Sequence, residues 1–333
     1  MDLLLSETGL AQLGDRLTAV VPDVRLLRLQ TDKRVLDPDG QEVADDDIRP
    51  EVAWGSADQF DEGTARRFFG LVLRAPSLRW LQSAAAGLDA PVFAMILDRG
   101  IRLTSAHVNS IPIAEWVLAS VLDHYQDPAA WRVGQADRAW RPRRFREVHG
   151  STWIVVGMGG IGRAVAVRAR AFGAEVIGVR RMPRGDEPVD EMVGVAELDA
   201  ALSRADVVVL ATPATAEARG MVDDAFLGRL RPGSVLVNVG RGALVDEDAL
   251  LRALDRGVPE RAILDVFATE PLPADSPFWD HPRVWVTPHS SAGGLGSLER
   301  GAELFLDNLG RYVRGELLLH EVGPDEVGEQ QDG

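Results

Sequence analysis

Short apolar runs alternate with helical patterns along the whole chain. In the N-terminal third, runs typical of buried strands cover residues 3–5, 24–29, 52–54, 78–83 and 101–104. Helical stretches lie between several of them, and this alternation is typical of a parallel sheet with crossover helices. A long helix is predicted from about residue 113 to residue 124, and the arginine-rich segment 131–146 after it is interpreted as a loop or arm.

The same alternation resumes after residue 150. Further strands are predicted over residues 154–156, 176–179, 207–210, 235–237, 262–266 and 284–286, and a last helix over 298–312. Each half of the chain carries enough strands and helices to bury its own sheet. The pattern therefore predicts the α/β class, with two doubly wound parallel-sheet domains.

A glycine motif lies at the first strand of the second half. Gly157, Gly159 and Gly162 follow the apolar run in G-x-G-x-x-G spacing, and a helical pattern and a second strand come after them. The first glycine permits a tight turn, the second lets the backbone approach a pyrophosphate, and the third lets helix and strand pack closely. Because a helix N-terminus favours phosphate, we expect Gly157, Gly159, Gly160, Ile161 and Gly162 to bind a dinucleotide.

The end of the second strand indicates which dinucleotide. An NAD site places Asp or Glu about 20 residues after the first glycine, to hold the ribose 2′-hydroxyl. This chain has Arg180 and Arg181 there instead. Guanidinium groups can bind a 2′-phosphate that a carboxylate would repel. NADP is therefore the preferred cofactor and NAD a possible one, unless these arginines are only solvated loop charges.

Composition narrows the choice of partners. The chain has 333 residues and a net charge of −15, which disfavours a nucleic-acid partner. It has no cysteine, so disulfides, thiolate nucleophiles and iron–sulfur clusters are excluded. The histidines other than His289 show no metal-ligand spacing, and no metal is expected. With no signal-like N-terminus and no apolar run of about 18 residues, we expect a cytoplasmic protein that does not bind membranes.

Three polar residues in the second half follow the carboxyl ends of predicted strands. Arg241 lies in NVGRGALVDEDAL, Glu270 in LDVFATEPLP and His289 in TPHSSAG. Open α/β sheets bind ligands at this edge, so the three are candidates for one site. The alternatives are an arginine of a surface turn, a glutamate at a helix end and a histidine packed in a loop.

These segments, together with GMGGIG and FGAEVIGV, resemble the D-isomer-specific 2-hydroxyacid dehydrogenase family over nearly the whole length. LRWLQSAAAGLD and IPIAEWVLA resemble most its glyoxylate/hydroxypyruvate reductase-like branch. The resemblance implies a Rossmann cofactor domain, residues 108–292, inserted into a flavodoxin-like substrate domain, residues 1–107 and 293–333. It also implies a homodimer, for which the arm 131–146 is a plausible contact.

The resemblance also implies roles for individual residues. Arg241, Glu270 and His289 correspond to the catalytic triad of the family. The residues expected to contact the cofactor beyond the glycine turn are Thr212, Pro213, Val239 and Asp265, with Asp265 on the nicotinamide carboxamide. The residues expected to contact the substrate are Trp54, Ala85, Ala86, Gly87 and Arg241.

The implied reaction is reduction of a small 2-keto acid, of the glyoxylate or hydroxypyruvate kind, to a D-2-hydroxy acid with NADPH. Arg241 can hold the keto acid by fork-like hydrogen bonds. His289 can give a proton to the carbonyl oxygen of the keto acid, which would otherwise become an alkoxide. Glu270 can orient the ring and stabilise its protonated form. The alternatives are an oxidative D-2-hydroxyacid dehydrogenase for a larger side chain, and a regulatory protein that senses nicotinamide cofactor.

Overall fold

The computed structural model describes residues 1–85, 87–88 and 90–323, and the chain divides into two compact units. Unit 1 comprises Met1–Asn109 and the chain from Leu295 onward, and unit 2 comprises Ser110–Gly294. The first boundary follows residue 109 rather than 107, and the second follows residue 294 rather than 292. Each unit is described by itself below.

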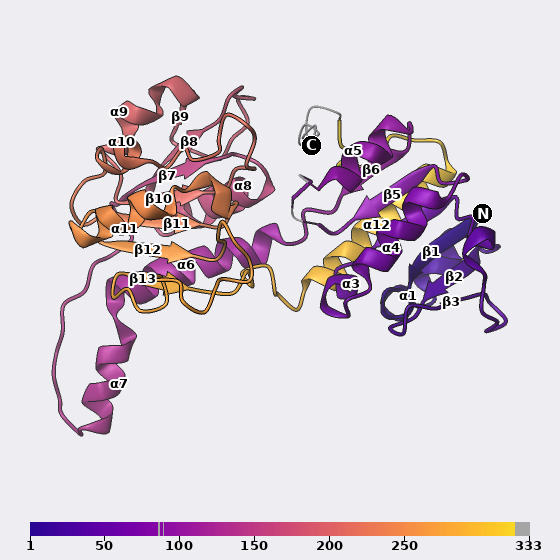
Figure 1. Cartoon of the computed structure of the whole chain (residues 1–333), viewed down its shortest axis with the longest axis horizontal. Coiled ribbons are helices and arrows are strands. Elements are labelled where there is room, and N and C mark those ends of the chain that lie inside the picture. The colour runs from indigo at the N-terminus through magenta and orange to yellow at the C-terminus, as the bar shows by residue number, and fades with distance from the viewer. Residues whose placement is uncertain (86, 89, 324–333) are drawn as a thin grey trace. The chain divides into compact units, whose positions relative to one another are not determined.

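Unit 1 contains one sheet with helices on both faces (Figure 1). Its strands are β1 (Asp2–Ser6), β2 (Arg25–Leu29), β3 (Val35–Leu36), β4 (Val52–Gly55), β5 (Trp80–Ser83) and β6 (Arg102–Ser105). Its helices are α1 (Glu7–Leu13), α2 (Arg16–Val20), α3 (Asp58–Asp61), α4 (Ala65–Arg74), α5 (Pro91–Asp98) and α12 (Ser297–Val313). Figure 1 shows α12, in yellow, beside elements from the N-terminal part of the chain.

The strand order of unit 1 is β3-β2-β1-β4-β5-β6. The five strands other than β3 are parallel, and their order is the 2-1-3-4-5 order of flavodoxin-like sheets. Side chains alternate between the faces: Leu4 packs in the core with α4 and α5, whereas Leu3 and Leu5 pack with α1 and α12. Both faces are therefore covered, which explains the continuous apolar runs in the sequence.

Unit 2 contains the second sheet. Its strands are β7 (Thr152–Val156), β8 (Glu175–Val179), β9 (Glu191–Val193), β10 (Val207–Leu210), β11 (Val235–Asn238), β12 (Arg261–Leu264) and β13 (Val284–Val286). Its helices are α6 (Ser110–Gln126), α7 (Pro128–Ala136), α8 (Gly160–Ala171), α9 (Leu198–Leu202), α10 (Asp224–Leu227) and α11 (Glu247–Asp255).

All strand pairs recorded in unit 2 are parallel, in the order β13-β12-β11-β10-β7-β8-β9. Helices α6 and α8 pack on one face, and α9, α10 and α11 pack on the other. The chain order reverses between β7 and β10, and the crevice at such a switch point is where Rossmann sheets bind dinucleotides. The predicted fold class, two doubly wound α/β domains, is confirmed.

Three elements differ from the sequence prediction. The arm expected to be irregular begins with a helix, α7, because Pro128 suits the first helical position and the Asp127 carboxylate accepts the N–H of Ala130 at 3.4 Å. The short strands β3 and β9 were not predicted. Each lies at a sheet edge and is only two or three residues long, so neither has room for an apolar period.

No helix within the described residues is long and apolar enough to cross a membrane.

Candidate functional site

Two glycines of the turn between β7 and α8 differ in what surrounds them. A Cβ on Gly162 would lie 1.9 Å from the carbonyl oxygen of Gly157, so only glycine lets helix and strand approach this closely. A Cβ on Gly159, in contrast, would meet nothing within 4 Å. Gly159 is exposed, and its bare backbone leaves room for a ligand to approach the turn.

The N-terminus of α8 suits an anion. Gly159 is its N-cap, no side-chain hydrogen bond caps it, and its first turn holds no acidic residue. The first N–H groups of a helix have no partner within the helix, and the helix dipole is positive there. Ile161 packs against the core of unit 2 and anchors the turn, while Gly160 is partly exposed. The five residues predicted to bind a dinucleotide therefore form one strand-turn-helix unit whose donors fit a pyrophosphate.

The end of β8 carries an acid that the sequence analysis missed. Arg180 Nη1 lies 3.6 Å from the carboxylate of Glu187, whose side chain is 1% exposed. The two oxygens of this carboxylate accept the backbone N–H groups of Arg184 and Gly185 at 2.8 Å each. The hydrogen bond from Arg184 is the main reason that the pKa of Glu187 is lowered, and the charge of Arg180 acts in the same direction.

Glu187 therefore closes the loop after β8 and faces one of the two arginines expected to bind the 2′-phosphate. Arg181 is exposed on the same loop. A glutamate seven residues after Arg180 gives no sequence signal, because its position depends on the path of the loop. The acid is buried and already accepts two donors, so it differs from the exposed carboxylate of an NAD site.

The loop after β10 lies beside the glycine turn. A Cβ on Gly157 would come within 2.8 Å of the backbone nitrogen of Thr212, and one on Gly240 within 2.7 Å of its carbonyl oxygen. Pro213 follows and is exposed. Val239 is 5% exposed and packs in the core, so only its backbone is available at this edge. Thr212 thus connects the glycine turn to the segment that carries Arg241.

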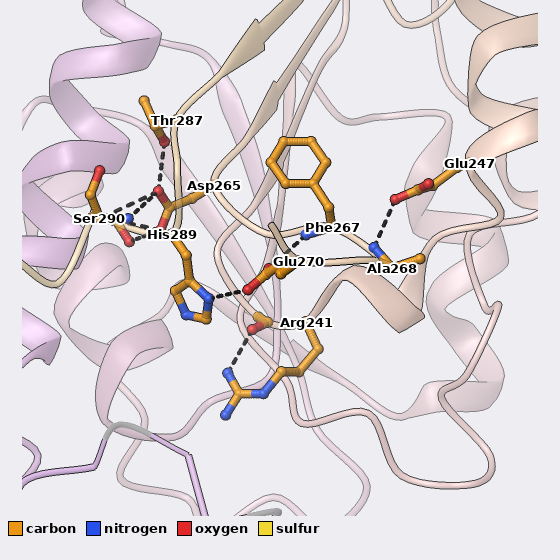
Figure 2. A network of polar contacts seen from close by, with 11 residues as sticks. Arg241, Glu247, Asp265, Phe267, Ala268, Glu270, Thr287, His289 and Ser290 are labelled. Carbon is orange, nitrogen blue, oxygen red and sulfur yellow. Dashed lines mark hydrogen bonds and ion pairs between the residues drawn. The ribbon is translucent and has the colours of Figure 1, made fainter. Parts of the chain in front are cut away.

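Arg241 extends from a turn that buried groups hold in place. The side chain of Asn238, which is 1% exposed, accepts the N–H of Gly240 at 3.1 Å and donates to the carbonyl of Arg241 at 3.0 Å. A Cβ on Gly242 would lie 1.8 Å from the carbonyl carbon of Phe267. The glycine therefore allows the loops after β11 and β12 to touch. Figure 2 shows the Arg241 side chain, whose Nη1 donates to the carbonyl of Gly240 at 2.8 Å.

The side chains of Glu270 and His289 are joined by a hydrogen bond. His289 Nδ1 lies 2.7 Å from one carboxylate oxygen of Glu270, and the other oxygen accepts the N–H of Phe267 at 2.9 Å (Figure 2). The same loop is held at Ala268, whose N–H donates to Glu247 at 2.8 Å. The ring of His289 is half exposed. Since Nδ1 faces Glu270, Nε2 is the nitrogen left to meet a substrate.

Asp265, which is predicted to contact the cofactor, lies among hydrogen-bond donors of the turn after β13. It is 1% exposed, and its carboxylate accepts the Thr287 hydroxyl at 2.6 Å, the Ser290 N–H at 2.9 Å and the Ser291 hydroxyl at 2.5 Å. The Ser291 N–H also donates to both oxygens. A carboxylate offers about four acceptor sites, so these donors occupy it. This placement does not support a contact with the nicotinamide carboxamide, and Asp265 instead holds the turn around His289.

The predicted triad comes from three neighbouring strands. Arg241 follows β11, Glu270 follows β12 and His289 follows β13, and the three strands pair in parallel. Their carboxyl ends meet at one edge of the sheet, and Figure 2 shows the three side chains in one network of polar contacts. No cluster of three or more histidine and carboxylate side chains that could hold a metal lies within the described residues.

The predicted substrate residues belong to unit 1. Ala85 donates its N–H to the hydroxyl of Ser83 at 3.2 Å, so this amide already has a partner. Gly87 is partly exposed, and Ala86 lies outside the described residues. Trp54 is fully buried and stacks on Phe305 of α12, with ring centroids 5.0 Å apart. This placement is that of a core residue and does not support the predicted contact of Trp54 with substrate.

The two sheets define a two-domain α/β protein, and the turn between β7 and α8 is of the dinucleotide-binding kind. Residues 118–291 match the D-isomer specific 2-hydroxyacid dehydrogenase, NAD binding domain. The chain therefore belongs to the D-isomer specific 2-hydroxyacid dehydrogenase family, and the predicted resemblance is confirmed.

Individual relatives of the chain carry several names. It is 34% identical over 251 residues to D-3-phosphoglycerate dehydrogenase of Mycobacterium bovis, covering 74% of this chain but only 47% of that protein. It is 34% identical to glyoxylate reductase of Korarchaeum cryptofilum, covering 76% of this chain and 78% of the relative. Among solved structures, the NADPH-dependent glyoxylate/hydroxypyruvate reductase of Sinorhizobium meliloti, in complex with NADP and sulfate, has a TM-score of 0.72 at 27% identity and covers 98% of both chains.

Proposed function

We propose that the protein reduces small 2-keto acids, of the glyoxylate or hydroxypyruvate kind, to D-2-hydroxy acids and prefers NADPH. The observation that carries the proposal is the 2.7 Å hydrogen bond between His289 and Glu270, on loops beside the one that holds Arg241. Reduction of a keto acid needs a proton donor, a group that binds the acid and a site for the cofactor. The paired histidine, the nearby guanidinium and the dinucleotide turn can supply these three.

The chain's own residues divide the work. When bound, the reduced nicotinamide supplies a hydride to the carbonyl carbon. Arg241 orients the keto acid through the fork of its guanidinium. His289 gives the proton on Nε2 to the carbonyl oxygen, so that no free alkoxide forms. Glu270 holds Nδ1 and stabilises the ring while it is protonated.

Two features of unit 2 support a nicotinamide dinucleotide that carries a 2′-phosphate. Gly159 and the uncapped end of α8 suit the pyrophosphate. Arg180 and Arg181 offer guanidinium groups where the ribose would lie. The Sinorhizobium meliloti relative of similar fold was solved with NADP. NAD binds less well in this proposal because its uncharged 2′-hydroxyl cannot form charge-assisted contacts with these guanidinium groups.

The proposal includes an assembly and a compartment. The exposed apolar side chains of α7 and the segment after it, Trp131, Val133, Trp140 and Phe145, support a homodimer formed through this arm. The absence of cysteine fits the reducing cytoplasm. The partners proposed are thus a small keto acid and a second copy of the chain.

A panel of 2-keto acids tests the proposal. Glyoxylate, hydroxypyruvate, pyruvate and bulkier keto acids are offered with NADPH and with NADH, and the absorbance of the reduced cofactor is followed. With NADPH, we expect the highest kcat/KM for glyoxylate and hydroxypyruvate. Turnover confined to bulky 2-hydroxy acids in the oxidative direction would instead favour a dehydrogenase of larger substrates. Cofactor binding without turnover of any acid would favour a sensor.

A further inference from the structure

Unit 1 contains a hollow that is lined by four basic residues and two glycines. It measures about 310 Å³ and is lined by Lys33, Gly63, Arg66, Arg67, Gly70 and Arg74. Lys33 comes from the turn between β2 and β3, and the others come from α4 and the turn before it. Four cations gather here on a chain whose net charge is −15. A cluster of positive side chains on a protein of negative net charge suggests that the cluster binds an anion.

Two of the three arginines of the hollow, Arg67 and Arg74, are held in place by one acid. Asp45 pairs with both terminal nitrogens of Arg67, one of them at 2.7 Å, and with Arg74 at 3.0 Å. The hydrogen bonds from Arg67 are the main reason that the pKa of Asp45 is lowered. Arg67 Nε also donates to the carbonyl of Lys33 at 3.3 Å, which ties the turn to the helix.

The charges of the hollow are not balanced. Within the described part of the chain, neither Lys33 nor Arg66 forms a recorded ion pair, and Asp45 compensates only one of the other two charges. Arginine forks and lysine point charges are the groups that bind phosphate oxygens. The remaining positive charge, focused in a concave site, would attract a ligand with at least two negative charges.

Gly70 supplies an independent observation. It lies in the interior of α4, and its φ is not in the left-handed region. A Cβ placed on it would meet nothing within 4 Å. Glycine destabilises a helix interior relative to alanine, so neither backbone geometry nor packing explains this residue. Its bare backbone does keep the floor of the hollow low, between Arg66 and Arg74 on the same helix face.

We infer that this hollow is a binding site for a small phosphorylated anion, separate in sequence and in unit from the dinucleotide turn. The phosphate oxygens are held by Lys33 and Arg66, with Arg67 and Arg74 oriented by Asp45, and the anion rests against the backbone at Gly70. The class of ligand is a pyrophosphate or a phosphorylated metabolite of similar size.

Inorganic pyrophosphate is the probe, titrated calorimetrically into the full chain at low salt. The background is the full chain saturated with NADPH, which occupies both the glycine turn and the arginines after β8, so that pyrophosphate cannot bind there. We expect this background to keep a pyrophosphate site. Adding Arg66→Gln should weaken it about tenfold, the order expected for one charge-assisted contact. Gly70→Ala should weaken it as well, because the new methyl group occupies the floor.

Two comparisons keep the result interpretable. Gly70→Ala should not lower the melting temperature, since alanine favours the helix, so weaker binding there cannot come from misfolding. Arg314→Gln removes an exposed arginine of the same unit outside the hollow and should leave the affinity unchanged. The inference is overturned if the background binds no pyrophosphate, or if Arg66→Gln and Gly70→Ala both bind it as tightly as the background does.

Discussion

His289 combines an unusual backbone conformation with its hydrogen bond to Glu270. Its φ is +50°, in the left-handed region that a residue with a side chain seldom adopts. Such a conformation costs roughly 1–3 kcal/mol and persists only where the surroundings hold it. Here the N–H of His289 donates to the carbonyl of Asp265 at 2.8 Å, and the next two residues donate to the carboxylate of Asp265. The turn is thus built to present the imidazole at the edge of the sheet.

The pH profile tests the assigned acid. Reduction needs the protonated ring, so kcat/KM for the keto acid should be full at low pH and fall as His289 loses its proton. Oxidation of the hydroxy acid should show the opposite limb. Glu270→Gln removes the carboxylate that holds Nδ1 and should lower kcat/KM for the keto acid, because the ring is then less well oriented. His289→Asn should lower the rate by roughly 10²–10⁴ while cofactor still binds. Near-normal turnover in that variant would contradict the assignment.

Asp265→Asn tests the residue that holds the turn. The amide keeps the size of the carboxylate but turns one acceptor into a donor that faces donors of the turn. A broken charge-assisted network of this kind should destabilise unit 2 by about 1–3 kcal/mol. Misplacement of His289 should lower kcat by roughly tenfold or more. Thr287→Ser keeps the hydroxyl donor and serves as the control. An unchanged kcat and melting temperature in the Asp265→Asn variant would show that the turn holds itself.

We propose that the loop after β8 selects NADPH over NADH. Arg180→Gln and Arg181→Gln should each lower the ratio of kcat/KM for NADPH to that for NADH by about tenfold, because each removes a charge-assisted contact with phosphate worth roughly 1.5–3 kcal/mol. Arg170→Gln, at the far end of α8, removes an equal charge and should leave the ratio unchanged. A wild-type protein that prefers NADH would refute the cofactor proposal.

Helix α6 carries a histidine that the fold keeps neutral. Burial lowers the pKa of His124, and the charge of Arg261 acts in the same direction. The unfolded chain binds a proton near pH 6.5 that the folded chain resists, so stability should be full above that pH and decline as pH falls below it. His124→Gln should flatten this decline in melting temperatures measured at about pH 8 and about pH 5.5. His149→Gln, an exposed histidine of the same unit, should not.

The elements that could be predicted from sequence are those whose signal is local. The glycine turn and the strands near Gly157, Arg241 and His289 show apolar runs and spacings that need no tertiary contact to be recognised. The contacts of Glu187 and Asp265 could not be predicted, because each depends on where a loop returns. Trp54 could not be predicted to be buried, for a similar reason. Its strand end was visible, but the covering of that face of β4 by a helix from the far end of the chain was not.

The arm of unit 2 sets the expected assembly of the whole molecule. Trp140 is 96% exposed, and Trp131 packs edge-on against Phe145 with ring centroids 5.8 Å apart. Large apolar groups displayed in this way favour a partner surface. We expect the wild type to sediment as a dimer at micromolar concentration, and Trp140→Glu with Val133→Glu to shift it toward the monomer. Leu317→Glu, an exposed leucine of unit 1, should leave the dimer intact. A monomeric wild type would contradict the proposal.

Because α12 belongs to the core of unit 1, the two units can fold at different times during synthesis. Phe305 and Leu309 of this helix share a core with Leu3, Trp54 and the rest of that face, so unit 1 needs both ends of the described chain. Unit 2 is continuous and can fold as soon as its last strand leaves the ribosome. Unit 1 cannot be completed until α12 is made, and until then one face of its sheet is uncovered. Once unit 2 has folded, it replaces a long flexible loop between the N-terminal part of unit 1 and α12, which lowers the entropic cost of bringing them together. The cofactor domain is thus the scaffold on which the other domain is completed.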